Sequence, residues 1–397
     1  MFFMLSISLA YLATGNSQPT FDVGKFGAAG DGETNDSPAF LKAWEAVCGA
    51  SGKTTLQIPA NKIFLLYPLQ FVGPCKSSFI HIQVMGKLLA PSANARRNST
   101  SVDCWLCFER VDGLLIDGPG QIDGNGETWW TKVPIHERPT SIIRLIILQA
   151  LHFHGCNDLR LSGLTHLNSQ KNHIGLHNCH GVSISNLHII APSDSPNTDG
   201  IDVSLSTQIL ISNTFIGTGS DDCIAVKGGT SNVNITRVTC GPGHGISIGS
   251  LGEDGANQIV DQVHVTGCTF NGSDNGARIK TTPGGTGFAR DVSFEGITLI
   301  ASGNPIVIDQ HYCNGRDHHC QDQEKAVAIS GVTFSGFQGT SADVEAINLD
   351  CSKQGCRGIT INNVNISSSV GHDVRAVCKN AHGTTVSTVP VVSCLLS

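Results

Sequence analysis

The chain has 397 residues and a formal net charge of −7 at pH 7; only 14% of its residues are charged, and 45 are glycine. This length fits one long β domain as well as two shorter domains, so the number of domains must come from internal pattern. Proteins that bind nucleic acid or anionic membranes need a broad basic surface, so the acidic balance argues against both classes. An anionic substrate would have to meet a local cluster of cations.

An apolar run occupies residues 2–13 and is too short to span a bilayer. The small and polar residues 14–17 follow it, as in the cleavage region of a secretory signal peptide. We therefore predict a signal peptide over residues 1–17, a single domain over residues 18–397 and no transmembrane segment. The alternative is that the apolar run forms a buried strand.

Fifteen cysteines are spread from Cys48 to Cys394 without the repeated spacing of a zinc site. This pattern is typical of disulfides in an exported protein, and the odd total leaves at least one thiol unpaired. Asn-x-Ser/Thr sequons would be glycosylation sites in the secretory pathway, although an Asn- and Ser-rich chain also produces them by chance. They begin at Asn35, Asn98, Asn234, Asn271 and Asn365.

The first predicted element is a helix that begins near Ser37. Apolar residues recur at a helical spacing, at positions 39, 40, 43, 44 and 47. Ser37 is a suitable N-cap, and Pro38 fits the first turn. We interpret this short helix as a cap over the open end of a β structure, where an exposed strand edge would otherwise promote aggregation.

From residue 110 onward, short runs of alternating apolar and polar residues recur, each typical of a strand with one buried face. They return at intervals of roughly 23 to 30 residues, with Gly and Asn between them and no helical period. This spacing argues against βαβ winding and predicts a parallel β-helix, with an all-β sandwich as the alternative. The runs are residues 159–161, 182–184, 209–211, 233–235, 263–265, 292–294 and 359–361.

Asparagines lie near the ends of several of these runs. Asn tolerates left-handed turns, and its amide can stack on its counterpart in the next coil, so each is either a simple turn residue or part of a ladder. They are Asn157, Asn178, Asn186 and Asn213.

The candidate chemistry falls in four segments: Asn197-Thr198-Asp199-Gly200, Ser220-Asp221-Asp222-Cys223, Gly243-His244-Gly245 and Arg278-Ile279-Lys280. Asp199, Asp222 and His244 are each separated by about one coil, so a stack would bring them together at about the 4.8 Å strand spacing. Arg278 and Lys280 lie two apart in a strand-like run, so both point to one face and could bind a carboxylated sugar. A pair of this kind is more often a solvated surface.

Three carboxylates gathered in a cleft repel one another. This repulsion raises the pKa of at least one of them and lets a protonated acid coexist with an ionised base. Glycoside hydrolysis needs this division of roles. Taken singly, an Asp-Asp pair in a β-rich protein is more often a turn or a calcium ligand, and a histidine between two glycines can be only a turn residue.

Together and in this order, the four segments resemble the signature of the polygalacturonases, glycoside hydrolases built on a right-handed parallel β-helix of the pectin-lyase-like type. The resemblance runs from Phe21-Asp22-Val23 to the C-terminal cysteines. Three further segments match parts of the family that line or support the substrate cleft: Asn168-Ser169-Gln170 before His173, Cys240–Ser250, and Gln310-His311-Tyr312-Cys313.

The resemblance implies catalytic roles for four residues. Asp221 would be the general acid that protonates the leaving glycosidic oxygen, while Asp199 and Asp222 activate water on the opposite face. The anomeric configuration would then be inverted. His244 would help to set the protonation state of the acid.

The resemblance also implies a substrate-binding set, in which the cations bind galacturonate carboxylates and the aromatic ring packs against a sugar: Arg278, Lys280, Tyr312 and Asn197. Cys223 and Cys240 would form a disulfide that braces the coil bearing the two adjacent aspartates. We expect no cofactor and no metal ion.

Ser220 departs from the family pattern, because it stands between Gly219 and Asp221 where the family runs Gly directly into Asp-Asp-Cys. An extra residue in a strand reverses the side-chain alternation unless a bulge absorbs it. Neighbouring aspartates on a regular strand also point to opposite faces. We therefore predict a bulge at Gly219-Ser220 that lets Asp221 and Asp222 share one site.

The sequence thus predicts a secreted, monomeric polygalacturonase that acts on pectin in the plant cell wall and binds neither nucleic acid nor a membrane. The similarity to pollen-type plant enzymes and the short N-terminal region favour exo-action, with endo-action as the alternative. A pectate-lyase-like enzyme would use calcium and a basic residue, but its arginine pattern is not found. A catalytically silent, pectin-binding or allergenic relative is the remaining alternative, and the intact acid set argues against it.

Overall fold

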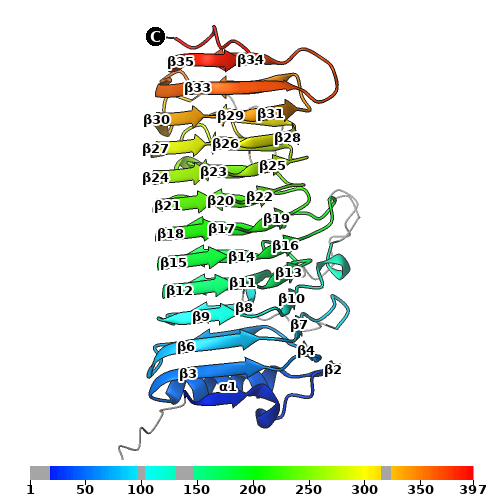
Figure 1. The fold of residues 1–397 in the computed structure, drawn as a ribbon. Helices are drawn as coiled ribbons and strands as arrows, with labels where there is room; N and C mark the ends of the chain where they lie inside the picture. The colour runs from blue at the N-terminus through cyan, green and yellow to red at the C-terminus, as the bar shows by residue number, and fades with distance from the viewer. Residues whose placement is uncertain (1–17, 96–102, 131–146, 314–322, 397) are drawn as a thin grey trace, which may run out of the picture.

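The structure is a computed structural model that describes residues 18–95, 103–130, 147–313 and 323–396. Parallel strands stack coil upon coil from the N-terminal end to the C-terminal end (Figure 1). The fold is a right-handed parallel β-helix, as predicted, and not a sandwich. The predicted signal peptide and the sequon at Asn98 lie outside the described residues.

One sheet of 11 strands carries the candidate functional residues on its outer face and in the turns that lead into it. Its strands are β5 (Leu69–Val72), β8 (Cys104–Glu109), β11 (Gln149–His154), β14 (Ile174–His177), β17 (Ile201–Ser204), β20 (Ile224–Val226), β23 (Ile246–Leu251), β26 (Asn275–Thr281), β29 (Asn304–Asp309), β32 (Glu345–Asp350) and β34 (Arg375–Lys379).

The other 24 strands form the rest of the coil wall, in two parallel rows that meet at β33. One row is β1 (Thr20–Asp22), β3 (Gly52–Ile58), β6 (Ser77–Val84), β9 (Leu114–Asp117), β12 (Asn157–Ser162), β15 (His180–Ser185), β18 (Thr207–Ser212), β21 (Thr230–Thr236), β24 (Asn257–Thr266), β27 (Thr286–Glu295), β30 (Ala328–Ser335), β33 (Cys356–Ser368) and β35 (Ala381–Val389). The other row is β2 (Asp31–Asn35), β4 (Ile63–Leu65), β7 (Lys87–Leu89), β10 (Gln121–Asp123), β13 (Thr165–Leu167), β16 (His188–Ile190), β19 (Phe215–Gly217), β22 (Thr239–Cys240), β25 (Thr269–Asn271), β28 (Thr298–Ser302) and β31 (Gln338–Ser341). Short 3-10 turns occur at Val23–Phe26, Gly126–Thr128 and Glu253–Gly255.

The core of the β-helix consists of apolar side chains stacked in register. Leu159 pairs with Val182, which pairs with Ile209, which in turn pairs with Val233, and all four are buried. Each of the alternating runs in the sequence is a strand of this row. The alternation works because every second residue points inward, so each new coil buries its apolar residues on those of the last.

The predicted helix is α1 (Ser37–Gly49), which lies across the N-terminal end of the stack (Figure 1). Its buried face packs on the first coils. The ring of Phe40 lies edge-on to Phe64 with centroids 5.4 Å apart, and Trp44 lies edge-on to Phe71 at 5.2 Å. The helix therefore closes the apolar interior at this end.

The predicted N-cap is wrong by one residue. Asp36 is the N-cap, and Ser37 is the first helical residue. The hydroxyl of Ser37 accepts a hydrogen bond from the backbone N–H of Tyr67 at 2.7 Å, so it fastens the helix to the coil beneath it. The Asp36 carboxylate accepts from the backbone N–H groups of Ala29 and Gly30 and holds the preceding loop.

Three of the four asparagines adopt left-handed backbone at the coil turns, with φ of 55° at Asn178, 54° at Asn186 and 51° at Asn213. Asn157 instead begins β12, and its side-chain amide donates to the carboxylate of Asp112 at 2.9 Å. Asn adopts left-handed backbone more readily than most residues, so it suits these turns.

The described cysteines include both disulfides and buried free thiols, as the odd total predicted. The disulfides link Cys48 to Cys75, Cys104 to Cys107, Cys223 to Cys240, Cys351 to Cys356 and Cys378 to Cys394. The free thiols are Cys156, Cys179 and Cys268. Across the described residues, no helix is both long enough and apolar enough to cross a membrane.

Candidate active site

A polar groove of about 420 Å³ lies over the middle strands of the 11-stranded sheet. It contains six of the eight predicted catalytic and substrate-binding residues: Asn197, Asp199, Asp221, Asp222, Lys280 and Tyr312. The rest of its lining is Gln149, Lys171, Asn172, Asp202, Lys227, Gly249, Ser250, Glu253 and Gln258. Residues from seven successive coils, β11 to β29, thus line one acidic groove.

Asp222 is the most enclosed of the acids, with a side chain 1% exposed. Nη2 of Arg278 lies 2.6 Å from its Oδ1, and Nζ of Lys280 lies 2.7 Å from its Oδ2. The hydroxyl of Ser247 also donates to Oδ1, at 2.8 Å. Burial alone would raise the pKa of this carboxyl, but Arg278 and Lys280 outweigh it and lower the pKa to about 2. Asp222 is therefore ionised across the ordinary pH range.

Asp199 has the opposite environment. Burial, followed by the neighbouring carboxylates of Asp202, Asp221 and Asp222, raises its pKa well above the usual value, and the more distant ammonium of Lys227 only partly opposes this. The groove therefore holds an ionised carboxylate at Asp222 beside a carboxyl at Asp199 that keeps its proton more readily. This is the separation of protonation states that acid–base chemistry requires.

Asp202 and Lys227 form a second ion pair in the groove, with Nζ 2.7 Å from Oδ2. Burial raises the pKa of Asp202 against the opposing effect of Lys227, and the same contact raises the pKa of Lys227. The Oδ1 atom of Asp202 is buried and has no hydrogen-bond partner among the described residues. One acceptor thus remains free in the groove.

Asp221 lies at the side of the groove that faces His244. Nδ1 of His244 is 3.7 Å from Oδ1 of Asp221, and its Nε2 is 3.4 Å from Oδ2 of Asp274. The backbone N–H of His244 also donates to the carbonyl of Asp221 at 2.8 Å. The imidazole is therefore placed between the carboxylates of Asp221 and Asp274.

Two groups of described residues place three metal-ligating atoms within 4.8 Å of one another: Asp221, Asp222 and His244, and Asp309, His311 and Asp350. In both groups a protein cation already contacts an acid. Arg278 and Lys280 contact Asp222, and Lys379 contacts Asp350. Neither donor set suits a divalent ion, because these cations occupy oxygens that a metal would need.

Tyr312 forms one wall of the groove. Its ring centre lies 5.1 Å from Nζ of Lys280, and its backbone N–H donates to the carbonyl of Thr281 at 3.3 Å. An ammonium over an aromatic face is favourable, so the ring and the cation hold each other in place. The exposed part of the ring remains available to a ligand.

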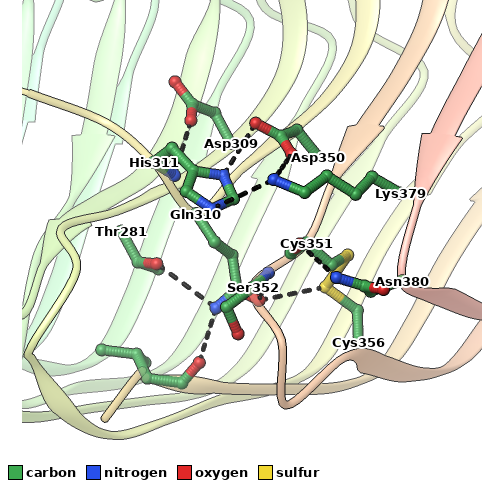
Figure 2. Close-up of a disulfide and its surroundings, with 11 residues drawn as sticks. Thr281, Asp309, Gln310, His311, Asp350, Cys351, Ser352, Cys356, Lys379 and Asn380 are labelled. Atoms are coloured by element: carbon green, nitrogen blue, oxygen red, sulfur yellow. Dashed lines mark hydrogen bonds and ion pairs between the residues drawn. A yellow bond between two sulfur atoms is a disulfide. The ribbon is translucent and has the colours of Figure 1, made fainter. Parts of the chain in front are cut away.

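The segment before Tyr312 is anchored to the coils that follow, and Figure 2 shows these contacts. The buried amide of Gln310 donates to the carbonyl of Val327 at 2.8 Å, and its oxygen accepts from the backbone N–H of Ser352 at 3.0 Å. The disulfide between Cys351 and Cys356 lies beside this contact.

The next residue, His311, is held between two charged side chains. Its Nδ1 is 2.7 Å from Oδ2 of Asp350, and its Nε2 is 3.4 Å from Nζ of Lys379 (Figure 2). These contacts fix the backbone from which Tyr312 projects.

The comparisons agree with this geometry. The sequence model of "Glycosyl hydrolases family 28" matches residues 48–392. The chain belongs to glycosyl hydrolases family 28. It is 46% identical over 98% of its length to a "Probable polygalacturonase" of Arabidopsis thaliana, covering 84% of that protein. It is 40% identical over 94% of its length to an "Exopolygalacturonase" of Zea mays, covering 90% of that protein.

Among solved structures, the endo-xylogalacturonan hydrolase from Aspergillus tubingensis superposes with a TM-score of 0.76 at 26% identity. The match covers 94% of this chain and 99% of that one. The protein is therefore a glycoside hydrolase of family 28 with the family's β-helix, as its sequence motifs predicted.

The turn that carries Asp221 and Asp222 differs from the prediction. Residues 218–223 connect β19 to β20 and are not part of any strand, so the predicted strand bulge at Gly219-Ser220 is wrong. The two aspartates leave the regular alternation because they lie in a turn. The hydroxyl of Ser220 donates to the carbonyl of Ser195 on the preceding coil at 2.6 Å. This hydrogen bond holds Ser220 against that coil, so the residue is not looped out.

Three features hold this family 28 turn in shape. Gly219 has a φ of 71°, and a Cβ there would lie 2.0 Å from the carbonyl oxygen of Pro192, so no side chain fits. The Thr218 hydroxyl donates to the carbonyl of Asp221 at 2.7 Å. The disulfide between Cys223 and Cys240, which the resemblance implied, closes the end of the turn onto the next coil.

Sequence reasoning did not single out Asp202, Lys227 or Ser247, although Ser247 lies within the matched segment Cys240–Ser250. Asp202 and Lys227 are separated by about one coil, the same interval that identified Asp199 and Asp222. Ser247 pairs in register with Arg278, so both side chains reach Asp222 from neighbouring strands. The coil spacing is therefore a usable signal for all three.

Proposed function

We propose that the chain is a polygalacturonase that hydrolyses α-1,4 linkages between galacturonate residues of pectin. The observation that carries this proposal is the gathering of Asp199, Asp221 and Asp222 in one groove, where Arg278 and Lys280 keep Asp222 ionised as a base. His244 lies beside Asp221, with Nδ1 3.7 Å from Oδ1. The names of the relatives in Arabidopsis and maize support the substrate class.

In the proposed mechanism Asp221 gives its proton to the glycosidic oxygen as the bond from that oxygen to the anomeric carbon breaks. Water attacks the anomeric carbon from the opposite face, Asp222 takes the proton of that water, and Asp199 orients it. The product has the inverted configuration. Asp222 then releases its proton to solvent, and His244 returns a proton from solvent to Asp221, so both acids regain their starting states.

Arg278 and Lys280 serve two tasks in this proposal. Both hold Asp222 in its ionised state. Each also has donors left over, because Arg has five N–H groups and Lys has three, and these can meet a galacturonate carboxylate. Tyr312 would pack on the sugar at the same position, and Asn197 would bind a hydroxyl group from the facing wall.

We further propose exo-action that releases single galacturonate residues, supported by the similarity to the maize exopolygalacturonase. The disulfides and the apolar segment over residues 2–13 support secretion to the cell wall, with residues 18–397 as one monomeric domain. Disulfides of this kind persist in oxidising compartments.

The test is incubation of the purified chain with polygalacturonate and with defined oligogalacturonates. We expect galacturonate monomer as the product from the start, and proton NMR should show the β anomer first. A ladder of oligomers would replace exo-action by endo-action. An initial α anomer would overturn the inverting mechanism, and absence of any product would favour the silent relative.

A further inference from the structure

Three lysines line the groove: Lys171, Lys227 and Lys280. Lys227 is paired with Asp202, and Lys280 is paired with Asp222, both at 2.7 Å. Lys171 is exposed and has no ion pair or hydrogen bond to any described side chain. Lys171 can therefore bind an anionic ligand without breaking an ion pair to an aspartate of the groove.

The position of Lys171 follows from the coil that carries it. Two residues later, the backbone N–H of His173 donates to the carbonyl of Asp199 at 2.8 Å, and Ile174 pairs with Ile201 on the next strand. Lys171 therefore lies one coil to the N-terminal side of Asp199, at a rise of about 4.8 Å, which is comparable to the length of one sugar unit.

Asn172, next to Lys171, presents a polar atom that lacks a partner. Its side chain is 2% exposed and lines the groove, and its Oδ1 has no hydrogen-bond partner among the described residues. Its Nδ2 donates to Oε1 of Gln149 at 3.3 Å, which fixes the direction of the amide. A buried acceptor without a donor is costly, and a sugar hydroxyl in the groove would satisfy it.

The wall behind these residues depends on Gly175. A Cβ at this position would lie 2.6 Å from Oε1 of Gln149 and 2.6 Å from Cδ2 of His152. The absence of a side chain at Gly175 lets Gln149 lie across the strand and meet Asn172. The three polar groups are thus built into one wall by the packing of β11 and β14.

We infer that Lys171, Asn172 and Gln149 form a sugar-binding subsite one sugar unit away from the scissile bond. Lys171 makes this subsite selective for a galacturonate with a free carboxylate over one with a methyl ester. The ammonium binds the carboxylate, and the Asn172 oxygen accepts from a hydroxyl of the same galacturonate. A methyl ester has no charge, so it loses the ammonium contact but keeps the hydroxyl contact. This inference rests on the proposed substrate class.

The first measurement is kcat/KM on polygalacturonate and on highly methyl-esterified pectin, for the unmodified chain, Lys171→Met and Lys171→Arg. Lys171→Met should lose about two- to fivefold on polygalacturonate, as expected for an exposed ion pair, and much less on the esterified polymer. Lys171→Arg keeps the charge and should keep most of the preference. Lys42→Met, on the exposed face of α1, is the matched control and should change neither value.

The second measurement separates this inference from the proposed activity. Titration calorimetry of tetragalacturonate and its methyl ester with the Asp221→Asn form, with and without Lys171→Met, reports binding without turnover. Weaker binding of the free acid alone in the double variant supports the subsite. Equal losses for acid and ester, or no loss, would overturn it, whether or not the unmodified chain hydrolyses polygalacturonate. Absence of hydrolysis with charge-dependent binding would overturn only the activity.

Discussion

The ammonium group of Lys280 forms an ion pair with Asp222, with Nζ 2.7 Å from Oδ2, where the two side chains are 8% and 1% exposed. The sequence motif had assigned Lys280 to the substrate. In the groove it first determines the charge of an acid, because Arg278, Lys280 and the hydroxyl of Ser247 together outweigh burial and lower the pKa of Asp222 to about 2.

Lys280→Met should therefore change the pH profile as well as the rate. Without the ammonium, burial raises the pKa of Asp222, so the base becomes protonated at higher pH. The acid limb of kcat/KM should move upward by about one pH unit or more. Lys280→Arg keeps a cation beside the carboxylate and should keep the limb in place. A lower rate with an unmoved limb in Lys280→Met would mean that this lysine acts on the substrate alone.

Asp221→Asn should abolish hydrolysis and leave the fold intact, because an amide cannot donate the acid proton. General acid catalysis contributes about 10²–10⁴-fold, and a loss in this range is expected. The thermal unfolding midpoint should stay close to that of the unmodified chain, since the carbonyl contacts of the turn remain. A variant that retained more than about a tenth of the rate would exclude Asp221 as the general acid.

Ser220 gives a prediction that differs from the one its sequence context suggested. A looped-out residue could be deleted without harm, but Ser220 is fastened to Ser195 within a turn. Deletion should shift Asp221 and Asp222 and cost about 10²-fold in kcat, since displacement by about 1 Å has effects of that size. Ser220→Ala should lose about 1 kcal/mol of stability and keep most of the activity. Full activity of the deletion would show that the turn can shorten without moving the acids.

His166 should make the protein less stable in mild acid. Its side chain is fully buried, neither ring nitrogen has a hydrogen-bond partner among the described residues, and burial lowers its pKa from 6.5 to about 3. The unfolded chain binds a proton below pH 6.5 and the folded chain does not, so stability falls as pH drops from 6.5 toward 3. At pH 5 the loss is about 2 kcal/mol.

His166→Leu should remove most of this loss, because Ile122 and Ile189 flank the position in register and a leucine suits them. The check is urea unfolding at pH 7 and pH 5, which should differ by about 2 kcal/mol less in the variant. The exposed imidazole of His188 provides the control, and His188→Gln should leave the difference unchanged. An unchanged difference in His166→Leu would place the acid sensitivity elsewhere, for example at His173, whose pKa burial also lowers.

The coil stack was predictable because its physical cause is periodic. Residues such as Leu159 and Val182 alternate with polar neighbours, and only repeated burial on one face explains the recurrence. The meeting of Asp199 with Asp222 followed from the same spacing. The turn at residues 218–223 was not predictable, because where a short strand stops depends on hydrogen bonds such as that of Ser220 to the previous coil. The pairing of Lys280 with Asp222 was not predictable. The spacing of Arg278 and Lys280 indicates that both side chains lie on one face of the sheet, but it does not indicate which side chain each of them contacts.

Each coil advances the stack by about 4.8 Å and supplies one strand to the 11-stranded sheet. The aspartates that we propose to be catalytic occupy the turns that lead into two successive coils, β17 and β20, while Gln149 projects from β11 and Tyr312 follows β29. A coil gained or lost outside this stretch would leave the acids and their cations in place, since each strand pairs only with its immediate neighbours. The length of polymer that such a protein binds can therefore change during evolution by whole coils, while the acidic residues and their cations stay unchanged.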